Sequence, residues 1–235
     1  VTFDPHPRSV LGEGRVPLLT TIEERAEVVE GLGIERFVVI PFTEEFSELA
    51  PETFVRDVLV DRVGCQEVVI GYDHRFGRNG EGDADTMRRL GEQYGFAVEV
   101  IPAQVFDDEI VSSSMLRELL LEEGDVEAAR HMLGRPYRMH GQVVHGDGRG
   151  ESIGYPTANL TVDQSAKVIP RRGVYAVRST RTDHPDRPEY GGMMNIGFRP
   201  TFTDEETLVP EVHLFDCSDE FYGETLRVDF MQRIR

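Results

Sequence analysis

The sequence predicts a mixed α/β protein in two parts, a layered half followed by an antiparallel all-β half. The first observation is that short apolar runs alternate with amphipathic helical stretches up to Gly134. The second is that apolar and polar residues alternate after Gly134, in runs that Gly and Pro residues separate. We therefore expect one domain over residues 1–134 and a second, a barrel or a sandwich, over residues 135–235.

The layered half is expected to hold parallel strands that helices connect. Thr20 or Thr21 can cap a first helix, which Gly31 and Gly33 end. Strand–helix–strand repetition with short links predicts a right-handed layered sheet. The expected helices cover residues 21–32, 51–62 and 83–94, and the expected strands cover residues 1–3, 36–41, 67–71 and 97–101, of which 36–41 and 67–71 have the apolar composition of buried strands.

The segment 112–134 predicts two helices that lead into the second half. The serine triplet 112–114 offers hydroxyl caps, and Gly124 ends the first helix. Asp125 caps the second helix and Gly134 closes it. Five runs then predict strands, and the acidic, proline-containing stretch 181–189 predicts a solvated hairpin loop; the runs are RMHGQVVHG, GVYAVRST, YGGMMNIG, EVHLFD and LRVDF.

The composition excludes several classes of protein. The chain has 235 residues with 39% hydrophobic residues, which is typical of a globular protein and not of a disordered one. Lys and Arg number 25 against 43 Asp and Glu, so the net charge is −18. Such acidity argues against a general nucleic-acid binder, but a nucleotide needs only a local patch of amides and cations. Adaptation to salt also explains the acidity and stays open.

The cysteines and the apolar runs indicate a cytoplasmic protein. Cys65 and Cys217 lie far apart and predict neither a disulfide framework nor a zinc site. No run approaches 18 apolar residues, so we expect no membrane span. The N-terminal VTFDPHP lacks the pattern of a signal peptide.

Two neighbouring motifs in the second half point to phosphate chemistry. Gly146, Gly148 and Gly150 stand at alternate positions, so their backbone can approach a ligand closely and their amides can form an anion nest. Thr157 and Asn159 follow and project to one side of an extended segment. A hydroxyl and an amide oxygen suit Mg²⁺ and phosphate oxygens. The alternative is that both motifs only form turns.

Glu211 is the candidate base of the second half. In the strand-like PEVHLFD, Glu211, His213 and Phe215 share one face, while Val212 and Leu214 share the other. A carboxylate on a barrel face near a nucleotide can accept a proton from an attacking alcohol. The alternative is a solvated glutamate without a role.

At these motifs the chain resembles a known family. The segments GDGRGESIGYPTANL, GVYAV, MNIGFRPTF, EVHLFD and FYGETLRVDF resemble, in order, the riboflavin kinase domain. VTFDPHP, GYDHRFGRNGEGD and VSSSMLRELLLEEGDVEAARHMLGRPY resemble the adenylyltransferase module of bacterial bifunctional riboflavin kinase/FAD synthetases. The resemblance covers the whole chain and implies a Rossmann-like nucleotidyltransferase module followed by an antiparallel β-barrel.

The resemblance implies a role for each kinase motif. The kinase transfers phosphate from ATP to riboflavin and forms FMN. Thr157 and Asn159 match residues that hold Mg²⁺ and the nucleotide phosphates, and Glu211 matches the base that takes the proton of the ribityl 5′-hydroxyl. Gly146, Gly148 and Gly150 match the loop over the ATP phosphates. Asn195 and Arg199 match a motif near the flavin; a turn stabiliser and a surface ion pair are their alternatives.

For the adenylyltransferase, the resemblance implies transfer of AMP from ATP to FMN, giving FAD and pyrophosphate. Asp73 matches a segment that contacts flavin, but His74 stands where the family usually has Phe. The residues expected to bind phosphates are Ser113, Ser114 and Arg117, with an ordinary helix cap as the alternative. Phe3 and His6 are expected at the flavin.

Two segments of the family pattern are expected outside this sequence. The H-x-G-H segment that stabilises the α-phosphate belongs before VTFDPHP, and a C-terminal helix belongs after Arg235. We therefore expect a gene product longer at both ends, and we expect that these 235 residues alone do not make FAD. A riboflavin kinase with a degenerate adenylyltransferase module and a non-catalytic flavin-binding protein remain the alternatives. The expected partners are small-molecule substrates, and the oligomeric state stays open.

Overall fold

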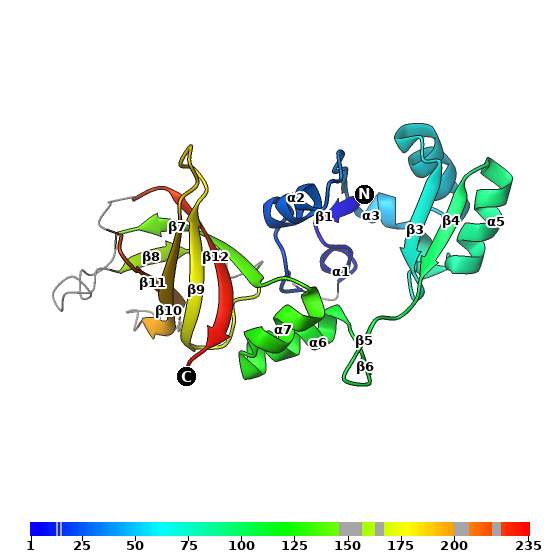
Figure 1. Cartoon of the computed structure of the whole chain (residues 1–235). Helices are drawn as coiled ribbons and strands as arrows, with labels where there is room; N and C mark the ends of the chain where they lie inside the picture. The colour runs from blue at the N-terminus through cyan, green and yellow to red at the C-terminus, as the bar shows by residue number, and fades with distance from the viewer. Residues whose placement is uncertain (13, 15, 146–156, 163–166, 200–206, 218–221) are drawn as a thin grey trace. The chain divides into compact units, whose positions relative to one another are not determined.

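The chain forms two compact units. The computed structural model describes residues 1–12, 14, 16–145, 157–162, 167–199, 207–217 and 222–235 (Figure 1). The first unit contains residues 1–16 and 36–111, and the second contains residues 17–35 and 112–235. The predicted domain boundary at residues 134–135 stays a prediction, because the two units are defined by how residues pack together and do not show where one family domain ends and the next begins.

The first unit carries two small parallel sheets. Strand β1 (Thr2–Asp4) pairs with β2 (Val39–Pro41), and β3 (Glu67–Gly71) pairs with β4 (Ala97–Ile101). The prediction of one layered sheet is wrong among the described residues, where the two strand pairs stay separate. The predicted strand 36–41 is also shorter, since β2 has three residues and Val39 is 39% exposed. An apolar run alone does not provide the second neighbour that buries a parallel strand.

Helices cover an apolar core in this unit. The predicted helix 83–94 is observed as α5 (Ala84–Tyr94), which Asp83 caps through a 2.9 Å bond from the amide of Thr86. The predicted helix 51–62 starts as α4 (Pro51–Thr53) and continues as the π-helix η1 (Phe54–Val63), which buries four apolar side chains. The remaining elements are α1 (Pro7–Val10), α3 (Glu44–Ser47), η2 (Arg78–Gly80), β5 (Val105–Phe106) and β6 (Glu109–Ile110).

The described residues of the second unit form four helical segments. Helix α2 (Ile22–Gly31) begins with a reciprocal capping box between Thr21 and Glu24. Helix α6 (Ser113–Glu118) continues as η3 (Leu119–Glu123), which ends at Gly124 with a left-handed φ of 70°. Asp125 then caps α7 (Val126–Leu133), so the caps and stops predicted for this segment are confirmed.

Six strands of the second unit close into a barrel. Their order is β10–β11–β8–β7–β12–β9, with β9 paired to β10, and all neighbours are antiparallel (Figure 1). The prediction of a barrel or a sandwich is therefore resolved as a barrel. Strand β8 adds to the five predicted strands; the bounds are β7 (Tyr137–Val144), β8 (Ala158–Thr161), β9 (Gly173–Arg181), β10 (Glu189–Arg199), β11 (Thr207–Leu214) and β12 (Thr225–Arg233).

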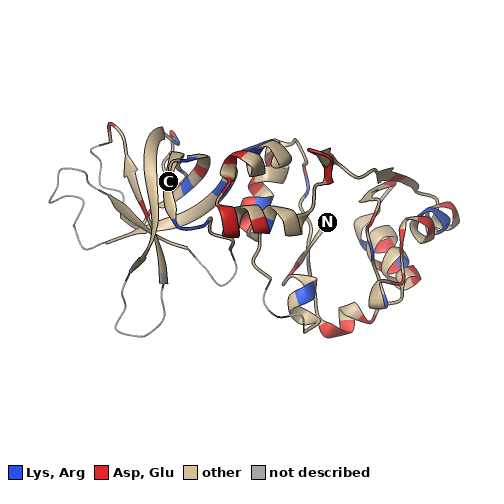
Figure 2. Ribbon diagram, turned by 90° about the horizontal axis from the view of Figure 1, so that it is seen from below, with Lys and Arg blue, Asp and Glu red and all other residues tan. Residues whose placement is uncertain are grey.

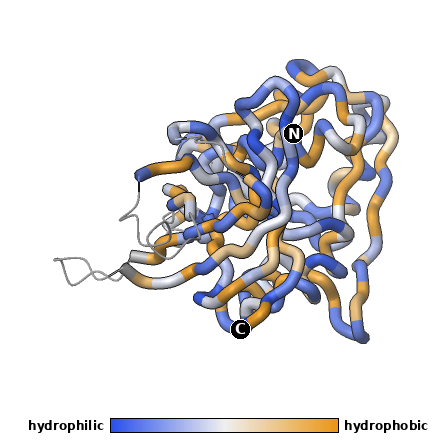
Figure 3. The backbone as a smooth tube through the Cα atoms, turned by 60° about the vertical axis from the view of Figure 1, so that its left-hand side comes forward, coloured by the Kyte–Doolittle hydropathy of each residue, from blue (hydrophilic) through white to orange (hydrophobic). Residues whose placement is uncertain are grey.

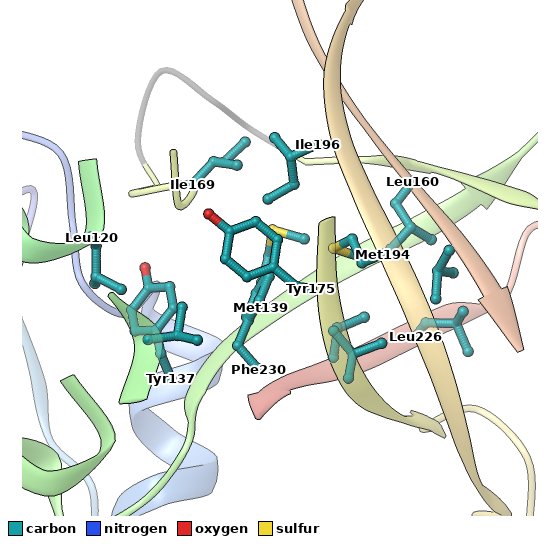
Figure 4. Packing of buried hydrophobic residues seen from close by; sticks show 14 of the residues in the cluster. Leu120, Tyr137, Met139, Leu160, Ile169, Tyr175, Met194, Ile196, Leu226 and Phe230 are labelled. Carbon is teal, nitrogen blue, oxygen red and sulfur yellow. The ribbon is translucent and has the colours of Figure 1, made fainter. Parts of the chain in front are cut away.

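The barrel interior is a packed apolar core. Tyr137, Tyr175 and Phe230 are almost completely buried, and the rings of Tyr175 and Phe230 meet edge to face at 5.3 Å (Figure 4). The hydroxyl of Tyr137 donates to the carbonyl of Val168 at 2.6 Å, so this buried polar group is satisfied. Figure 3 shows apolar and polar residues in alternation along the chain, which is the pattern that places every second strand residue inside.

Helix α2 docks on the outside of this barrel through a buried ion pair. The Nζ of Lys167 donates to Oε2 of Glu24 at 2.6 Å and to the carbonyls of Leu19 and Arg138 at 2.7 Å each. Glu24 and Lys167 are 1% and 2% exposed. The Lys167 ammonium also lies 4.5 Å from the ring centre of Tyr137. Burial lowers the pKa of Lys167 to about 8, although Glu24 opposes that shift.

The surface and the thiols agree with the expectations from composition. Figure 2 shows acidic and basic residues interleaved along the helices. Cys65 and Cys217 are both free, and burial raises the pKa of the Cys65 thiol. No helix among the described residues has the length and apolarity that a membrane crossing requires.

Candidate active site

The candidate kinase site is a row of polar residues across three neighbouring strands of the barrel. Glu211 on β11 stands opposite Asn159 on β8 and, on its other side, opposite Asn195 on β10. Residues directly opposite in antiparallel strands point to the same face, with Cβ atoms about 4.5–5.5 Å apart. The fold therefore brings together three residues that the sequence predicts for the kinase site, from positions up to 52 apart in the sequence.

This row lies on the face of the strands that points away from the core. Val212, next to Glu211, is fully buried inside the barrel, and so are Met194 and Ile196 on either side of Asn195. The predicted alternation of β11 is confirmed, since Leu214 is also buried while Glu211 is only partly buried. Side chains on the outer face are the ones that a ligand can reach.

Asn159 is buried although it points away from the core. It is 6% exposed, and its Oδ1 has no hydrogen-bond partner among the described residues. A buried carbonyl oxygen without a partner costs about 1–3 kcal/mol, so such an atom needs an explanation. A ligand or a metal ion that binds to this oxygen would provide it.

Several predicted kinase residues cannot be placed, and one is placed in part. Gly146, Gly148 and Gly150 lie outside the described residues, and so does Pro156. Arg199 is the last residue of β10, where it pairs with Thr207, but its side chain is outside the description. Thr157 is partly buried and directly precedes β8, next to the row that Asn159 joins.

The residues present fit a magnesium ion that is shared with a nucleotide. The oxygens available are the Thr157 hydroxyl and the orphan Oδ1 of Asn159. Mg²⁺ prefers such oxygen ligands, keeps several waters and is usually held jointly by protein and phosphates. Over the described part of the chain, no three His, Cys, Asp or Glu side chains gather into a metal cluster, so an all-protein cage is not formed there.

In the first unit, the predicted flavin residue Phe3 belongs to an aromatic cluster. Its ring centre lies 5.4 Å from that of Phe42 and 5.6 Å from that of Phe46, and Phe54 follows at 6.4 Å. His6 caps α1 by accepting a bond from the amide of Arg8 through Nδ1 at 3.2 Å. Phe3 thus has a packing role, and His6 a capping role, that are compatible with the predicted flavin contact but do not require it.

Asp73 and His74 form part of the turn after β3. The amide of His74 donates to the carbonyl of Gly71 at 3.1 Å, and Asp73 is exposed. The His74 ring lies nearly parallel to Phe76 at 6.1 Å, and burial lowers the pKa of His74.

The predicted phosphate residues of the adenylyltransferase lie in the second unit. Ser112 caps α6 by accepting from the amide of Met115 at 3.2 Å, so the alternative of an ordinary cap is confirmed for this serine. Arg117 donates to the carbonyls of Pro17 at 2.7 Å and Ser113 at 3.0 Å. Ser114 and Ser113 form the first turn of the helix. Phe3, His6 and Asp73 lie in the other unit.

Two features of the second unit escaped the sequence analysis. One is the pair of Glu24 and Lys167, which are 143 residues apart and whose side chains are both buried. A lysine inside the apolar run AKVIP was the available signal. The other is the set of residues on β8 and β10 that flank the face shared by Glu211 and His213, because these neighbours become visible only once the strand register is known.

Comparison with known proteins gives the class and then the family. A family model described as riboflavin kinase matches residues 133–235, and one described as FAD synthetase matches residues 1–115. The fold, the polar row and the two family models thus define a transferase with two parts, one for each flavin activity.

Relatives match over the whole chain. The bifunctional riboflavin kinase/FMN adenylyltransferases of Listeria monocytogenes and Bacillus subtilis are each 38% identical, across 100% of this chain and 73% of those proteins. A crystal structure titled as a macrolide-efflux protein from Streptococcus pneumoniae superposes with a TM-score of 0.84 at 29% identity, over 100% of this chain and 75% of that one. The chain belongs to the family of bifunctional riboflavin kinase/FMN adenylyltransferases.

Proposed function

We propose that the barrel transfers the γ-phosphoryl group of ATP to the 5′-hydroxyl of riboflavin, which gives FMN and ADP, and that Glu211 is the general base. The observation that carries the proposal is the row Asn159–Glu211–Asn195 on the outer face of the barrel. It places a carboxylate directly beside a buried amide oxygen that has no partner in the described structure. An acceptor for a proton and an oxygen for the nucleotide–metal complex are thereby adjacent.

The phosphoryl transfer requires mainly that the substrates are correctly oriented and that the negative charge of the phosphates is compensated. Phosphoryl transfer proceeds with the attacking and leaving oxygens in line, and catalysis is largely orientation plus electrostatic stabilisation. Thr157 and Asn159 hold the phosphates and Mg²⁺, which supplies positive charge to the phosphate oxygens when bound. Glu211 accepts the proton from the ribityl hydroxyl as that oxygen attacks phosphorus. Asn195, on the far side of Glu211, contacts the flavin substrate, and Arg199 follows it on the same strand.

The first half of the chain is proposed to serve the second activity, the transfer of AMP from ATP to FMN, which gives FAD and pyrophosphate. The match of residues 1–115 to the FAD synthetase model and the relatives of the whole chain support this. Phe3, His6 and Asp73 are the proposed flavin residues. Ser113, Ser114 and Arg117 are the proposed phosphate residues, as hydroxyls and a cation in the first turns of a helix suit phosphate oxygens.

The surroundings of the enzyme follow from its charge and its substrates. The substrates are the small molecules ATP, riboflavin and FMN, and the cytoplasm holds them. A net charge of −18 disfavours binding to nucleic acids. Local amides, a hydroxyl and a metal ion are sufficient to hold a nucleotide against this global charge.

The test of the kinase proposal is the variant Glu211→Gln. It keeps size and hydrogen bonding but removes the base, so we expect FMN formation to fall by about 10²–10⁴-fold while riboflavin still binds. Chromatography of the products from riboflavin, ATP and Mg²⁺ measures the rate, and flavin fluorescence measures binding. Glu189→Gln on β10 is the matched control, because Glu189 is exposed and pairs only loosely with Arg178 at 3.7 Å. Turnover of Glu211→Gln at the rate of the control would refute the assignment of the base.

A further inference from the structure

His213 occupies the position next to Glu211 on the outer face of β11. Glu211 and His213 are two residues apart in the strand, so their side chains point to the same face about 7 Å apart. Val212 between them pairs with Ala158 on β8. The strand β8 begins at Ala158, which Thr157 directly precedes in the chain. On β10, His213 pairs with Met193, so a second row, His213–Met193, lies directly next to the row Asn159–Glu211–Asn195.

The strand packing fixes the place of the His213 ring. The imidazole is partly buried and meets the ring of Phe215 edge to face at 5.7 Å. The amide of Phe215 donates to the carbonyl of Gly191 at 2.8 Å, which anchors β11 to β10. At the next residue, a Cβ on Gly192 would lie 2.5 Å from the carbonyl oxygen of His213, so only glycine permits this close approach. The imidazole is thus presented from a tightly held backbone.

The residues Thr157, Asn159, Glu211 and Asn195 offer no positive charge to an anion. Glu211 carries negative charge, and the orphan Oδ1 of Asn159 is an acceptor. The donors that these residues offer are the Thr157 hydroxyl and the side-chain NH2 groups of Asn159 and Asn195. An imidazole adds an N–H donor even when it is neutral, and a positive charge when it is protonated. A polyanionic phosphate chain requires such donors where it passes a carboxylate.

We propose that His213 donates a hydrogen bond from its imidazole to the phosphate chain of ATP beside Thr157, and so sets the distance of the nucleotide from Glu211. The proposal rests on the proposed kinase function and names a further residue of the same site. Its role is to position the nucleotide; the proton from riboflavin still goes to Glu211.

The experiment measures binding and turnover in His213→Ala and His213→Gln. A hydrogen bond to a charged group corresponds to about 10–100-fold in affinity, so we expect calorimetry to show Mg·ATP binding weaker by that factor in His213→Ala. The KM for ATP should rise in parallel, while riboflavin binding stays unchanged. His213→Gln keeps a donor on a longer side chain and should recover part of the loss. His131→Ala, at an exposed position of α7, is the control and should behave as the parent protein.

Two outcomes would overturn the proposal. One is His213→Ala with the parent's affinity for Mg·ATP. The other is equal loss of ATP and riboflavin affinity together with a lower melting temperature, which means that the side chain only stabilises the strand. Glu211→Gln separates this proposal from the proposed function: if that variant turns over normally the base assignment fails, while the calorimetry still decides for or against His213.

Discussion

Two regions of the same barrel bury polar groups in opposite ways. Under α2, the Lys167 ammonium has three oxygen partners within 2.7 Å, and Oε1 of Glu24 accepts the amide of His140 at 3.0 Å. Even the atoms there without a hydrogen bond, Nε2 of His140 and Nε of Arg227, have a carboxylate oxygen within 3.4 Å. In the polar row, Oδ1 of Asn159 is buried with no hydrogen-bond partner among the described residues.

The difference separates structure from function. A buried polar group that the chain itself satisfies holds elements together, because its desolvation is compensated within the fold. A buried polar group that the chain leaves unsatisfied costs stability in the free protein, and a ligand can recover that cost on binding. The face under α2 is accordingly an internal interface, and the row at Glu211 is the proposed binding face.

The largest effect is expected where the satisfied pair is broken. Lys167→Met leaves the carboxylate of Glu24 buried without its cation, and removal of one partner of a buried pair costs about 3–5 kcal/mol. Hydrogen exchange of the amides in β7 and β12 of the whole chain should report this loss, because both strands belong to the barrel under α2. In the folded fraction, affinity for Mg·ATP should remain unchanged.

The double variant Glu24→Met/Lys167→Met is the control for this prediction. Replacement of both charges by apolar side chains removes the unpaired ion, so most of the lost stability should return. Recovery will be incomplete, since Oε1 of Glu24 also accepts from His140 and Oε2 from Thr21. Protection in the double variant below that of Lys167→Met would show that the pair is not a coupled unit.

In the polar row, removal of a polar group should change the stability of the protein in the opposite direction. Asn159→Leu replaces an orphan polar group with an apolar one of similar size, so the free energy of unfolding should rise by about 1 kcal/mol while Mg·ATP binding is lost. Urea denaturation and calorimetry measure the two quantities. Thr161→Val, an exposed position on the same strand, should change neither. A less stable Asn159→Leu variant that still binds Mg·ATP would remove the distinction between the two regions.

The smallest effect concerns a partly exposed pair and its pH dependence. Bonds of 2.9 and 2.7 Å from the Arg181 guanidinium lower the pKa of Glu224 below its ordinary 4.5. A carboxylate with a lowered folded pKa stabilises the protein above its unfolded pKa, and this contribution is lost as the pH falls through the folded value. Glu224→Gln should therefore cost about 1 kcal/mol at neutral pH.

Denaturation curves between neutral pH and pH 3 check this prediction, because the difference between parent and Glu224→Gln should shrink below pH 4.5. Glu189→Gln is again the comparison, as its pair with Arg178 is exposed and should show no such dependence. A difference that is constant across this range would mean that the ion pair does not contribute through its charge.

Most of the local structure could be predicted from short stretches of sequence. Thr21 and Asp125 cap the helices that they were expected to cap, and Gly124 ends the segment where it was expected to end. Caps and stops depend on the backbone within four residues, so the sequence contains their full cause. The site residues Thr157, Asn159 and Glu211 were likewise found by residue type, spacing and family resemblance.

Pairing over long distances could not be predicted in this way. The apolar run 36–41 gave a three-residue strand, and the described part of the first unit holds two separate parallel strand pairs instead of one parallel sheet. β8 was described only as an extended segment, and its pairing with β7 and β11 closes the barrel and places Asn159 beside Glu211. A strand's neighbours depend on the whole set of strands that compete for its edges, which no local pattern contains.

The sequence by itself determined the two-part organisation, the helix ends, the alternation that separates core from surface, and the residue types of the kinase site. Only the tertiary structure decided that α2 packs on the barrel through Glu24 and Lys167, and that Asn159, Glu211 and Asn195 form one row with His213 in the next. The physical reason is that propensity and capping act between neighbours in the chain, while register, burial and the satisfaction of polar groups are properties of surfaces that meet only on folding.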